Sequence, residues 1–389
     1  MMGAFGYWGV AFFFALSGFL VGRILIRALN QHNDCKWVPN FLYRRWLKTF
    51  PLYYLVLFIS GYINGFPENF VLYIFYLKGF TTWTGLEFYN ASWSLFVEEL
   101  FYVICALVAV IICLKKSKMY AKSLLNFCFF IIVVAIAYRF FYNVFVGVDY
   151  NNPSKLAIAR LDSPMLGFLI AIIKEFYPLV FYVVEKNRNK ILLASFVGIS
   201  GLLAGSIYQE FANIVIYLML FLFTSILGIM FSGALRRKAL ALCGVNFFGN
   251  GYRKVFSYLI AFGISVCLFL SFSQVYAKYF VGVWFYLVGA ALSAIFLIYF
   301  ITMPEFKIGK RASAVILFIS QSSYAVYLIH EEVIHFLMSL IKNTPREHDV
   351  TYSFIILFLS IFIIYFLAYL LVILVERPIL NWRDRNVKV

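Results

Sequence analysis

Long apolar runs recur from one end of this chain to the other and limit its possible folds more than any other feature. A transmembrane helix needs about 20 consecutive apolar residues to cross the hydrocarbon core of a bilayer. Runs of roughly that length lie near residues 5–26, 47–63, 92–113, 124–146, 156–174, 190–207, 212–233, 256–273, 279–302, 312–337 and 352–375. The sequence therefore predicts an all-α polytopic membrane protein with about eleven transmembrane helices in one bundle.

The composition agrees with this fold class. The 389 residues are 64% hydrophobic and 13% charged, whereas soluble domains carry about 25% charged residues. The polar breaks leave no room for a separate soluble domain, so we expect one transmembrane domain over residues 1–389. A cleaved signal peptide is not indicated, because the basic residues Arg23 and Arg27 follow the first run and none precede it.

Basic residues alternate between the breaks. Lys and Arg outnumber Asp and Glu by 33 to 17, and they gather near residues 23–48, 115–122, 174–190, 236–254, 307–311 and 377–388. The breaks between these are near neutral or mixed. The positive-inside rule then places the N-terminus outside and the C-terminus in the cytoplasm. We assign the positive charge to cytoplasmic loops and anionic lipid, and we expect no nucleic-acid partner.

The cysteines do not follow a metal or disulfide pattern. No two of them form a CxxC pair, and most lie within apolar runs, which is typical of small core residues. The six are Cys35, Cys105, Cys113, Cys128, Cys243 and Cys267. The sequence therefore predicts neither a disulfide framework nor a zinc site, and no metal is expected.

Two adjacent carboxylates, Glu98 and Glu99, open one of the runs. A charge at the bilayer centre costs at least about 2.5 kcal/mol, so intramembrane ionisable residues are functional candidates. Neighbouring side chains on a helix point about 100° apart, so these two cannot form a close acid/base pair in one site. In the alternative, one carboxylate sits at the helix N-terminus and the other reaches the interface.

Arg160 and Asp162 lie near the outer end of another run. Side chains two positions apart diverge on a helix, so each needs a partner on another helix, and Glu98 or Glu99 is a candidate. A purely structural pair between helices is the alternative. Arg139 lies in the middle of a run with no carboxylate nearby in sequence, and no role is assigned to it.

A polar stripe follows the run near residues 312–337. Tyr324, Tyr327, Glu331 and His335 recur at i, i+3, i+7 and i+11, which places them on one helix face, with His330 on its flank. Hydroxyls, a carboxylate and an imidazole in one stripe are candidates for catalysis or binding. A hydrogen-bonded structural histidine is the alternative.

A basic cluster lies at the predicted inner face. Arg44 and Lys48 are four residues apart and share a helix face, with Arg45 beside them. This geometry suits several phosphate groups. The alternative is an ordinary topology signal beside acidic lipid.

Six stretches repeat a known order of motifs. They are residues 9–20 (GVAFFFALSGFL), 44–53 (RRWLKTFPLY), 93–102 (WSLFVEELFY), 160–167 (RLDSPMLG), 323–330 (SYAVYLIH) and 375–378 (VERP). Their order and spacing resemble the integral-membrane acyltransferase 3 family, bacterial enzymes that O-acylate surface polysaccharides, peptidoglycan and other exported molecules. The departures are Ala11 in place of Asp, Lys48 in place of the third Arg and Leu100 in place of Gln.

This resemblance implies a bacterial inner-membrane transferase. It would take an acyl group, typically acetyl, from cytoplasmic acyl-CoA to a hydroxyl of an envelope or lipid-linked glycan, in contact with membrane lipid. It implies catalytic roles for Glu98, Arg160, Asp162, Tyr324 and His330. It implies acyl-CoA binding by Arg44, Arg45 and Lys48, and substrate binding by Ser17, Trp93, Ser94, Glu99, Tyr327 and Glu331. No oligomeric state is predicted.

The family's first helix, which carries an Arg and the catalytic His, has no counterpart before residues 9–20. We therefore expect a true start roughly 25 to 40 residues upstream, and we expect the chain as written to be nearly inactive. His330 already fills a position of its own in the family pattern, which argues against it as a substitute for the missing base; activity of this chain that is lost on His330→Ala would instead make His330 the base. Two other functions stay open. One is a transporter or flippase, which should show two corresponding halves that this sequence lacks. The other is a non-catalytic member of the fold, which the missing histidine favours.

Overall fold

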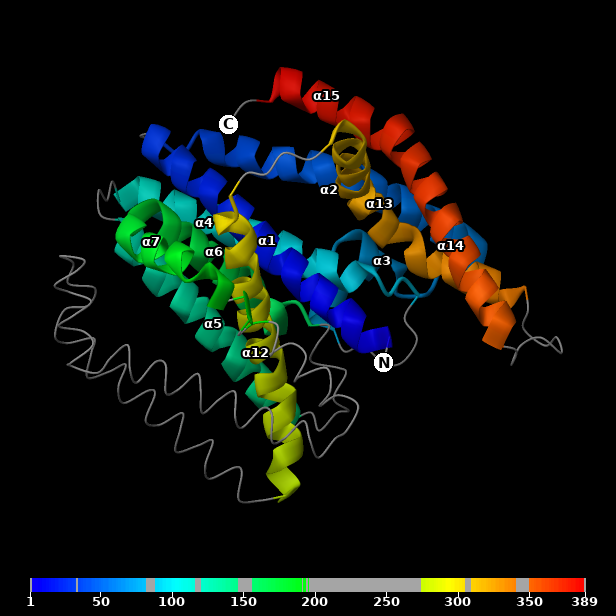
Figure 1. Cartoon of the computed structure of the whole chain (residues 1–389), viewed down its shortest axis with the longest axis horizontal. Helices are drawn as coiled ribbons and strands as arrows, with labels where there is room; N and C mark the ends of the chain where they lie inside the picture. The colour runs from blue at the N-terminus through cyan, green and yellow to red at the C-terminus, as the bar shows by residue number, and fades with distance from the viewer. Residues whose placement is uncertain are drawn as a thin grey trace. The chain divides into compact units, whose positions relative to one another are not determined.

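The protein is an α-helical polytopic membrane protein (Figure 1). The computed structural model describes residues 2–32, 34–81, 88–115, 120–145, 156–190, 192–193, 195, 274–304, 309–340 and 350–387. Within these residues six helices are long and apolar enough to cross a membrane, and one bent pair makes a possible seventh. The predicted runs 190–207, 212–233 and 256–273 fall largely or wholly outside the described residues. The predicted total of about eleven helices therefore stays a prediction.

The chain groups into two compact units, each built from two segments. The first unit comprises Met1–Arg27 and Lys118–Met303, and the second comprises Ala28–Ser117 and Pro304–Val389. Each unit is described by itself below. That the chain acts as one transmembrane domain stays a prediction.

The first unit contains most of α1 and a group of mutually contacting helices. In this group α5, α6 and α12 pack against one another, and α7 follows α6. The bounds are α1 Met2–Gln31, α5 Tyr120–Phe145, the 3-10 turn η3 Ile158–Arg160, α6 Asp162–Phe176, α7 Pro178–Lys186 and α12 Gln274–Thr302.

The predicted run near residues 156–174 contains most of α6, and the helical segment continues past it with a bend. The structure has η3, a 15-residue α6 and then α7, which turns away by 109°. The bend falls at Tyr177, whose φ of −130° and ψ of 60° are not helical. A proline ring clashes with a helical conformation of the preceding residue, so Pro178 ends α6 and begins α7.

Two glycines let α1 and α6 touch through their backbones. A Cβ on Gly18 would lie 1.9 Å from the carbonyl oxygen of Pro164, and a Cβ on Gly167 would lie 1.9 Å from that of Ala15. Small residues of this kind let membrane helices approach closely. Two of the stretches that carry the family resemblance, 9–20 and 160–167, therefore meet at this crossing.

We expect Gly18→Ala to lower stability by roughly 2–3 kcal/mol or more, because its new Cβ would overlap a backbone carbonyl that cannot move aside. Gly9→Ala is the matched control, since Gly9 lies on the same helix with no atom within 4 Å of its Cβ position. Alanine favours a helix over glycine, so the control should keep or raise stability. Thermal unfolding in detergent measures both. Equal midpoints for the two variants would contradict the close approach of α1 and α6.

The second unit holds the remaining elements. In it α13 packs against α14 and α2, and α2 also contacts α4 and α15. Figure 1 shows α14 continuing through a π turn into α15. The bounds are α2 Trp37–Asn64, α3 Phe70–Ile74, η1 Lys78–Phe80, α4 Ser92–Lys115, α13 Lys310–Ser339, α14 Val350–Leu371, the π turn η4 Val372–Glu376 and α15 Arg377–Asn386.

The basic break expected over residues 23–48 is mostly helical. Arg23 and Arg27 lie inside α1, and Arg44 lies inside α2. Only the short connection between Gln31 and Trp37 is left as a break. The sequence marks the end of each apolar run, but basic side chains also prolong helices past that end, because their long stems carry the charge to water.

The outer surfaces of α13 and α14 are apolar. Their large exposed side chains include Val315, Ile316, Leu317, Ile319, Ile355, Phe358, Phe362 and Phe366. Monomeric soluble proteins rarely expose so continuous an apolar surface. These faces are therefore suited to lipid.

Candidate functional site

The predicted polar stripe lies on α13, whose helical course is confirmed. The Tyr324 hydroxyl donates a hydrogen bond to the Thr49 carbonyl on α2, with an O···O distance of 2.8 Å. The Ser94 hydroxyl on α4 donates to the Tyr327 hydroxyl over 2.7 Å, and Tyr327 donates to the Ala91 carbonyl over 3.1 Å. Tyr324 and Tyr327, about one helical turn apart, thus hydrogen-bond α13 to α2 and to α4.

Further polar contacts follow toward the C-terminal end of α13. We call the row of contacts from Tyr324 to Glu332 the seam. The Asn90 amide donates to the Glu331 carboxylate over 2.9 Å. The Tyr89 hydroxyl donates to the Leu328 carbonyl over 2.9 Å. Burial raises the pKa of Tyr89 well above its usual value, so this hydroxyl stays neutral and keeps its proton for the bond.

One member of the seam was missed by the sequence analysis. Glu332 accepts hydrogen bonds from the Ser60 hydroxyl at 2.9 Å and the Asn64 amide at 3.1 Å, both on α2. The sequence did contain a signal for it, because Glu332 follows His330 and Glu331 directly and is the third ionisable residue in a row. Its neighbour Glu331 instead faces Asn90, so the two adjacent carboxylates diverge as helix geometry requires.

The histidine on the flank of the stripe has a defined hydrogen-bond arrangement. Nδ1 of His330 lies 2.6 Å from the carbonyl oxygen of Tyr327, one turn earlier on α13. A carbonyl oxygen only accepts, so the proton of this bond belongs to Nδ1. In the neutral ring the lone pair then resides on Nε2. The side chain is half-buried, whereas His335, farther along the stripe, is exposed.

Glu98 and Glu99 lie in different surroundings, as predicted from the divergence of neighbouring side chains on a helix. Glu99 is 7% exposed and accepts bonds from the Trp46 indole at 3.0 Å and the Thr49 hydroxyl at 2.9 Å. Glu98 is half-buried and accepts a bond from the Tyr102 hydroxyl at 3.2 Å. Glu99 therefore links α4 to α2, and sequence reasoning missed both of its donors on α2.

We expect Glu99→Ala to lower stability more than Glu98→Ala does. Removing the Glu99 carboxylate leaves the Trp46 indole without its acceptor, and a buried donor left unpaired costs about 1–3 kcal/mol. The Thr49 hydroxyl is left with the Arg45 carbonyl at 3.3 Å. Glu98→Ala is the matched control, because it removes a carboxylate from the neighbouring position, which is less buried. Thermal midpoints of both purified variants decide the comparison. A larger loss for Glu98→Ala would contradict the assignment of the buried link to Glu99.

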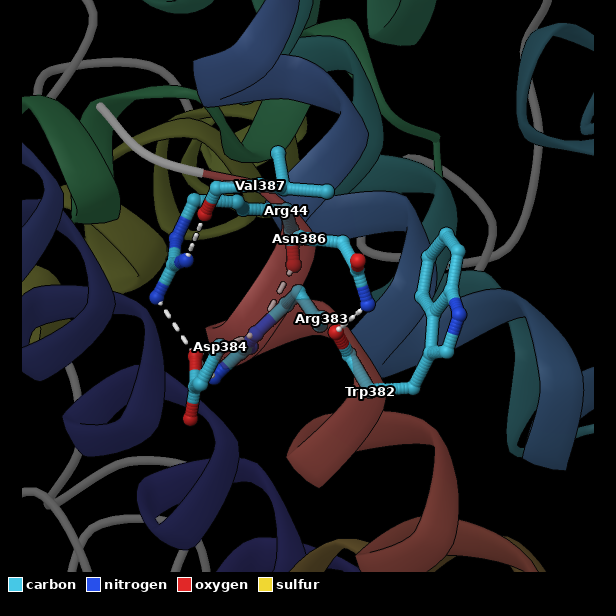
Figure 2. A network of polar contacts seen from close by, with 6 residues as sticks. All are labelled: Arg44, Trp382, Arg383, Asp384, Asn386 and Val387. Atoms are coloured by element: carbon cyan, nitrogen blue, oxygen red, sulfur yellow. Dashed lines mark hydrogen bonds and ion pairs between the residues drawn. The ribbon is translucent and has the colours of Figure 1, made fainter.

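The basic cluster at Arg44 is paired inside the protein (Figure 2). Arg44 donates through Nη2 to Asp384 over 2.7 Å and through Nη1 to the Val387 carbonyl. Arg383 binds the same Asp384 oxygen, with Nε at 3.0 Å and Nη2 at 2.9 Å. Arg44 thus forms an ion pair within the protein that the sequence analysis did not predict. Its partner is 340 residues away in sequence, beyond the reach of pattern reasoning.

The other two cations of the cluster differ from Arg44. Arg45 lies over the rings of Phe41 and Tyr102, at 5.8 and 6.0 Å from their centroids. Such cation–π contacts hold a guanidinium without neutralising it. Lys48 is exposed. Glu98 is a carboxylate near Arg45, and Glu376 is a carboxylate near Lys48.

In the first unit the structure finds a partner for Arg139. Arg139 and Asp162 are fully buried, and their side chains form an ion pair of 2.8 Å. Arg139 also donates to the Ala159 carbonyl over 2.8 Å, and Asp162 accepts from the backbone N–H of Ser163. These contacts favour the structural alternative for Asp162. Breaking such a pair by removing one partner is strongly destabilising.

The remaining predicted residues lie as follows. Arg160 is fully buried, with its guanidinium 5.2 Å from the Tyr286 ring centroid and 5.9 Å from that of Phe14. Ser17 is half-buried on α1 in the first unit, and Trp93 is half-buried on α4 in the second. The second unit thus contains most of the predicted site residues, and the first contains Ser17, Arg160 and Asp162.

Comparison with protein-family models, characterised proteins and solved structures finds no match to this chain. In the part of the chain that the structure describes, no three His, Cys, Asp or Glu side chains are grouped as a metal ion requires. The function is therefore inferred from the described side chains and the motif resemblance.

Proposed function

We propose that this membrane protein is an O-acyltransferase of a bacterial inner membrane. It transfers an acyl group, expected to be acetyl, from cytoplasmic acyl-CoA to a hydroxyl of an envelope or lipid-linked glycan. The proposal departs from the expectation that the chain as written lacks its base, because it assigns the base to His330, and the arrangement of this side chain is the observation that carries it. The bond from its Nδ1 to the Tyr327 carbonyl, 2.6 Å long, leaves Nε2 as a proton acceptor in a half-buried position.

Such a nitrogen suits the base that acyl transfer to a hydroxyl requires. Nε2 of His330 takes the proton of the acceptor hydroxyl while the hydroxyl oxygen attacks the thioester carbonyl carbon. The tetrahedral intermediate then breaks its carbon–sulfur bond. The imidazolium returns the proton to the leaving CoA thiolate, so the products are an O-acyl ester, free CoA and a neutral histidine.

The neighbours of His330 support a polar acceptor. Tyr327 and Glu331 lie on the same helix, and Ser94 and Asn90 reach them from the start of α4 and the segment before it. Hydroxyl, amide and carboxylate groups placed together can orient an acceptor that carries several hydroxyls. This surrounding fits a saccharide better than a purely apolar substrate.

The cations of α2 support the donor. Arg44, Arg45 and Lys48 lie within five residues of one helix, and CoA carries several phosphates that guanidinium and ammonium groups bind. They occur within the chain segment that charge alternation assigns to the cytoplasmic side. Acyl-CoA is made in the cytoplasm, so this assignment suits donor binding there.

We expect His330→Gln to lower the rate of acyl transfer by about 10²- to 10⁴-fold, which is the usual contribution of a general base. Glutamine keeps the polarity and much of the volume, so the thermal midpoint should change little. The assay uses purified protein in vesicles, isotopically labelled acetyl-CoA and an oligosaccharide acceptor. His335→Gln is the matched control, because His335 lies on the same helix and is exposed.

Full activity of His330→Gln, or equal losses in both variants, would remove His330 as the base. If wild-type protein moved the oligosaccharide across the vesicle membrane without adding an acyl group, the protein would instead be a transporter. The same vesicles report both outcomes.

A further inference from the structure

Two arginines from distant parts of the second unit converge on one carboxylate oxygen. Oδ1 of Asp384 lies 2.7 Å from Arg44 Nη2 and 2.9 Å from Arg383 Nη2 (Figure 2). Arg44 comes from α2, whereas Arg383 and Asp384 are neighbours on α15. Arg383 also donates to the Arg44 carbonyl over 3.4 Å, which ties the two arginines to each other. The result is a pair of guanidinium groups already arranged around a single anion.

The charge of this group remains positive. Asp384 neutralises one of the two guanidinium charges, and Glu376 is a second carboxylate near Arg383 and Lys48. Lys48 and Arg45 lie on the same stretch of α2 as Arg44, so cations still outnumber these two carboxylates. A phosphate oxygen presents the same acceptor geometry to a guanidinium as a carboxylate oxygen does, with more charge and more oxygens. A phosphate group would therefore satisfy both arginines better than Asp384 does.

The carboxylate is also open to replacement. The Asp384 side chain is 55% exposed, and those of Arg44 and Arg383 are 28% and 16% exposed. Ion pairs at such exposure contribute little to stability, because water screens both charges. The two arginine side chains are thus less exposed than the carboxylate that they bind. Asp384 can therefore leave while the two guanidinium groups stay in place.

α15 begins where such a movement can be accommodated. It follows the π turn Val372–Glu376, and π turns are frequent at functional sites in helices. The Glu376 side chain in that turn is 9% exposed, and its Oε2 accepts no hydrogen bond within the described residues. The cations Lys48, Arg377 and Arg383 lie near this carboxylate, so the turn borders the arginine pair.

We propose that Arg44 and Arg383 form a phosphate-binding site and that Asp384 occupies this site in the unliganded protein as an internal competitor. Binding of a phosphate group displaces the carboxylate and releases the Arg44–Asp384 link between α2 and α15. The identification of the phosphate with that of acyl-CoA rests on the proposed function. The phosphate site itself rests on the two arginines alone.

The test measures binding of coenzyme A to the full chain in a detergent that carries no phosphate. Asp384→Asn should tighten binding about two- to five-fold, the range that a surface ion pair supports. Arg383→Gln should weaken binding about tenfold, because it removes a charge-assisted bond to phosphate. Asparagine keeps one oxygen that accepts a hydrogen bond, so the helix contact is expected to survive.

Asp34→Asn is the matched control for net charge. Asp34 is also 55% exposed, and it also pairs with a cation, Lys36, at 3.8 Å. Its replacement adds the same positive charge to the second unit away from the proposed site. If Asp34→Asn tightens binding as much as Asp384→Asn, or if Asp384→Asn tightens binding neither to coenzyme A nor to vesicles that contain phosphatidylglycerol, the internal competitor is refuted.

A second arm separates the two sources of phosphate. Wild type and Asp384→Asn are compared on phosphatidylcholine vesicles with and without phosphatidylglycerol. A gain confined to the anionic vesicles, with no gain toward coenzyme A, supports the site but assigns it to lipid headgroups. A gain toward coenzyme A in a protein that transfers no acyl group supports the site and refutes only the proposed function.

Discussion

A bilayer offers no hydrogen-bond partner to polar groups, and the rest of this structure depends on that constraint. Every polar side chain within the helices must find its partner inside the protein or reach the interface. In the first unit, Arg139 and Asp162 meet this requirement as a fully buried ion pair. In the second unit, α13 meets it through a seam of hydroxyl, amide and carboxylate contacts that runs from Tyr324 to Glu332.

The seam also links packing to chemistry. Because Tyr324 binds α2 and Tyr327 binds α4, α13 can neither rotate nor slide without losing several bonds. Its register in turn fixes the Tyr327 carbonyl that holds Nδ1 of His330. A base aligned by the scaffold loses no further freedom when substrate binds, which is how preorganised sites gain rate. The polar contacts thus stabilise the unit and orient its candidate base together.

The sequence predicts what local periodicity encodes. Apolar runs predicted the membrane class and the long described helices, and helix geometry predicted that Glu98 and Glu99 diverge. The partners of Arg139, Arg44 and Glu99 lie on other helices, and no spacing along the chain encodes such a pairing. The bend at Tyr177 follows from Pro178, which lies just beyond the predicted run 156–174 and disfavours a helical conformation of the residue before it.

The most direct measurement is mass spectrometry of surface and lipid-linked glycans from bacteria that express this chain and from bacteria that lack it. Acyl transfer predicts glycan species heavier by one acyl group in the expressing cells, lost when the ester is removed by mild base. Identical glycans in the two strains, with the protein present in the membrane, would contradict its assignment as a glycan O-acyltransferase.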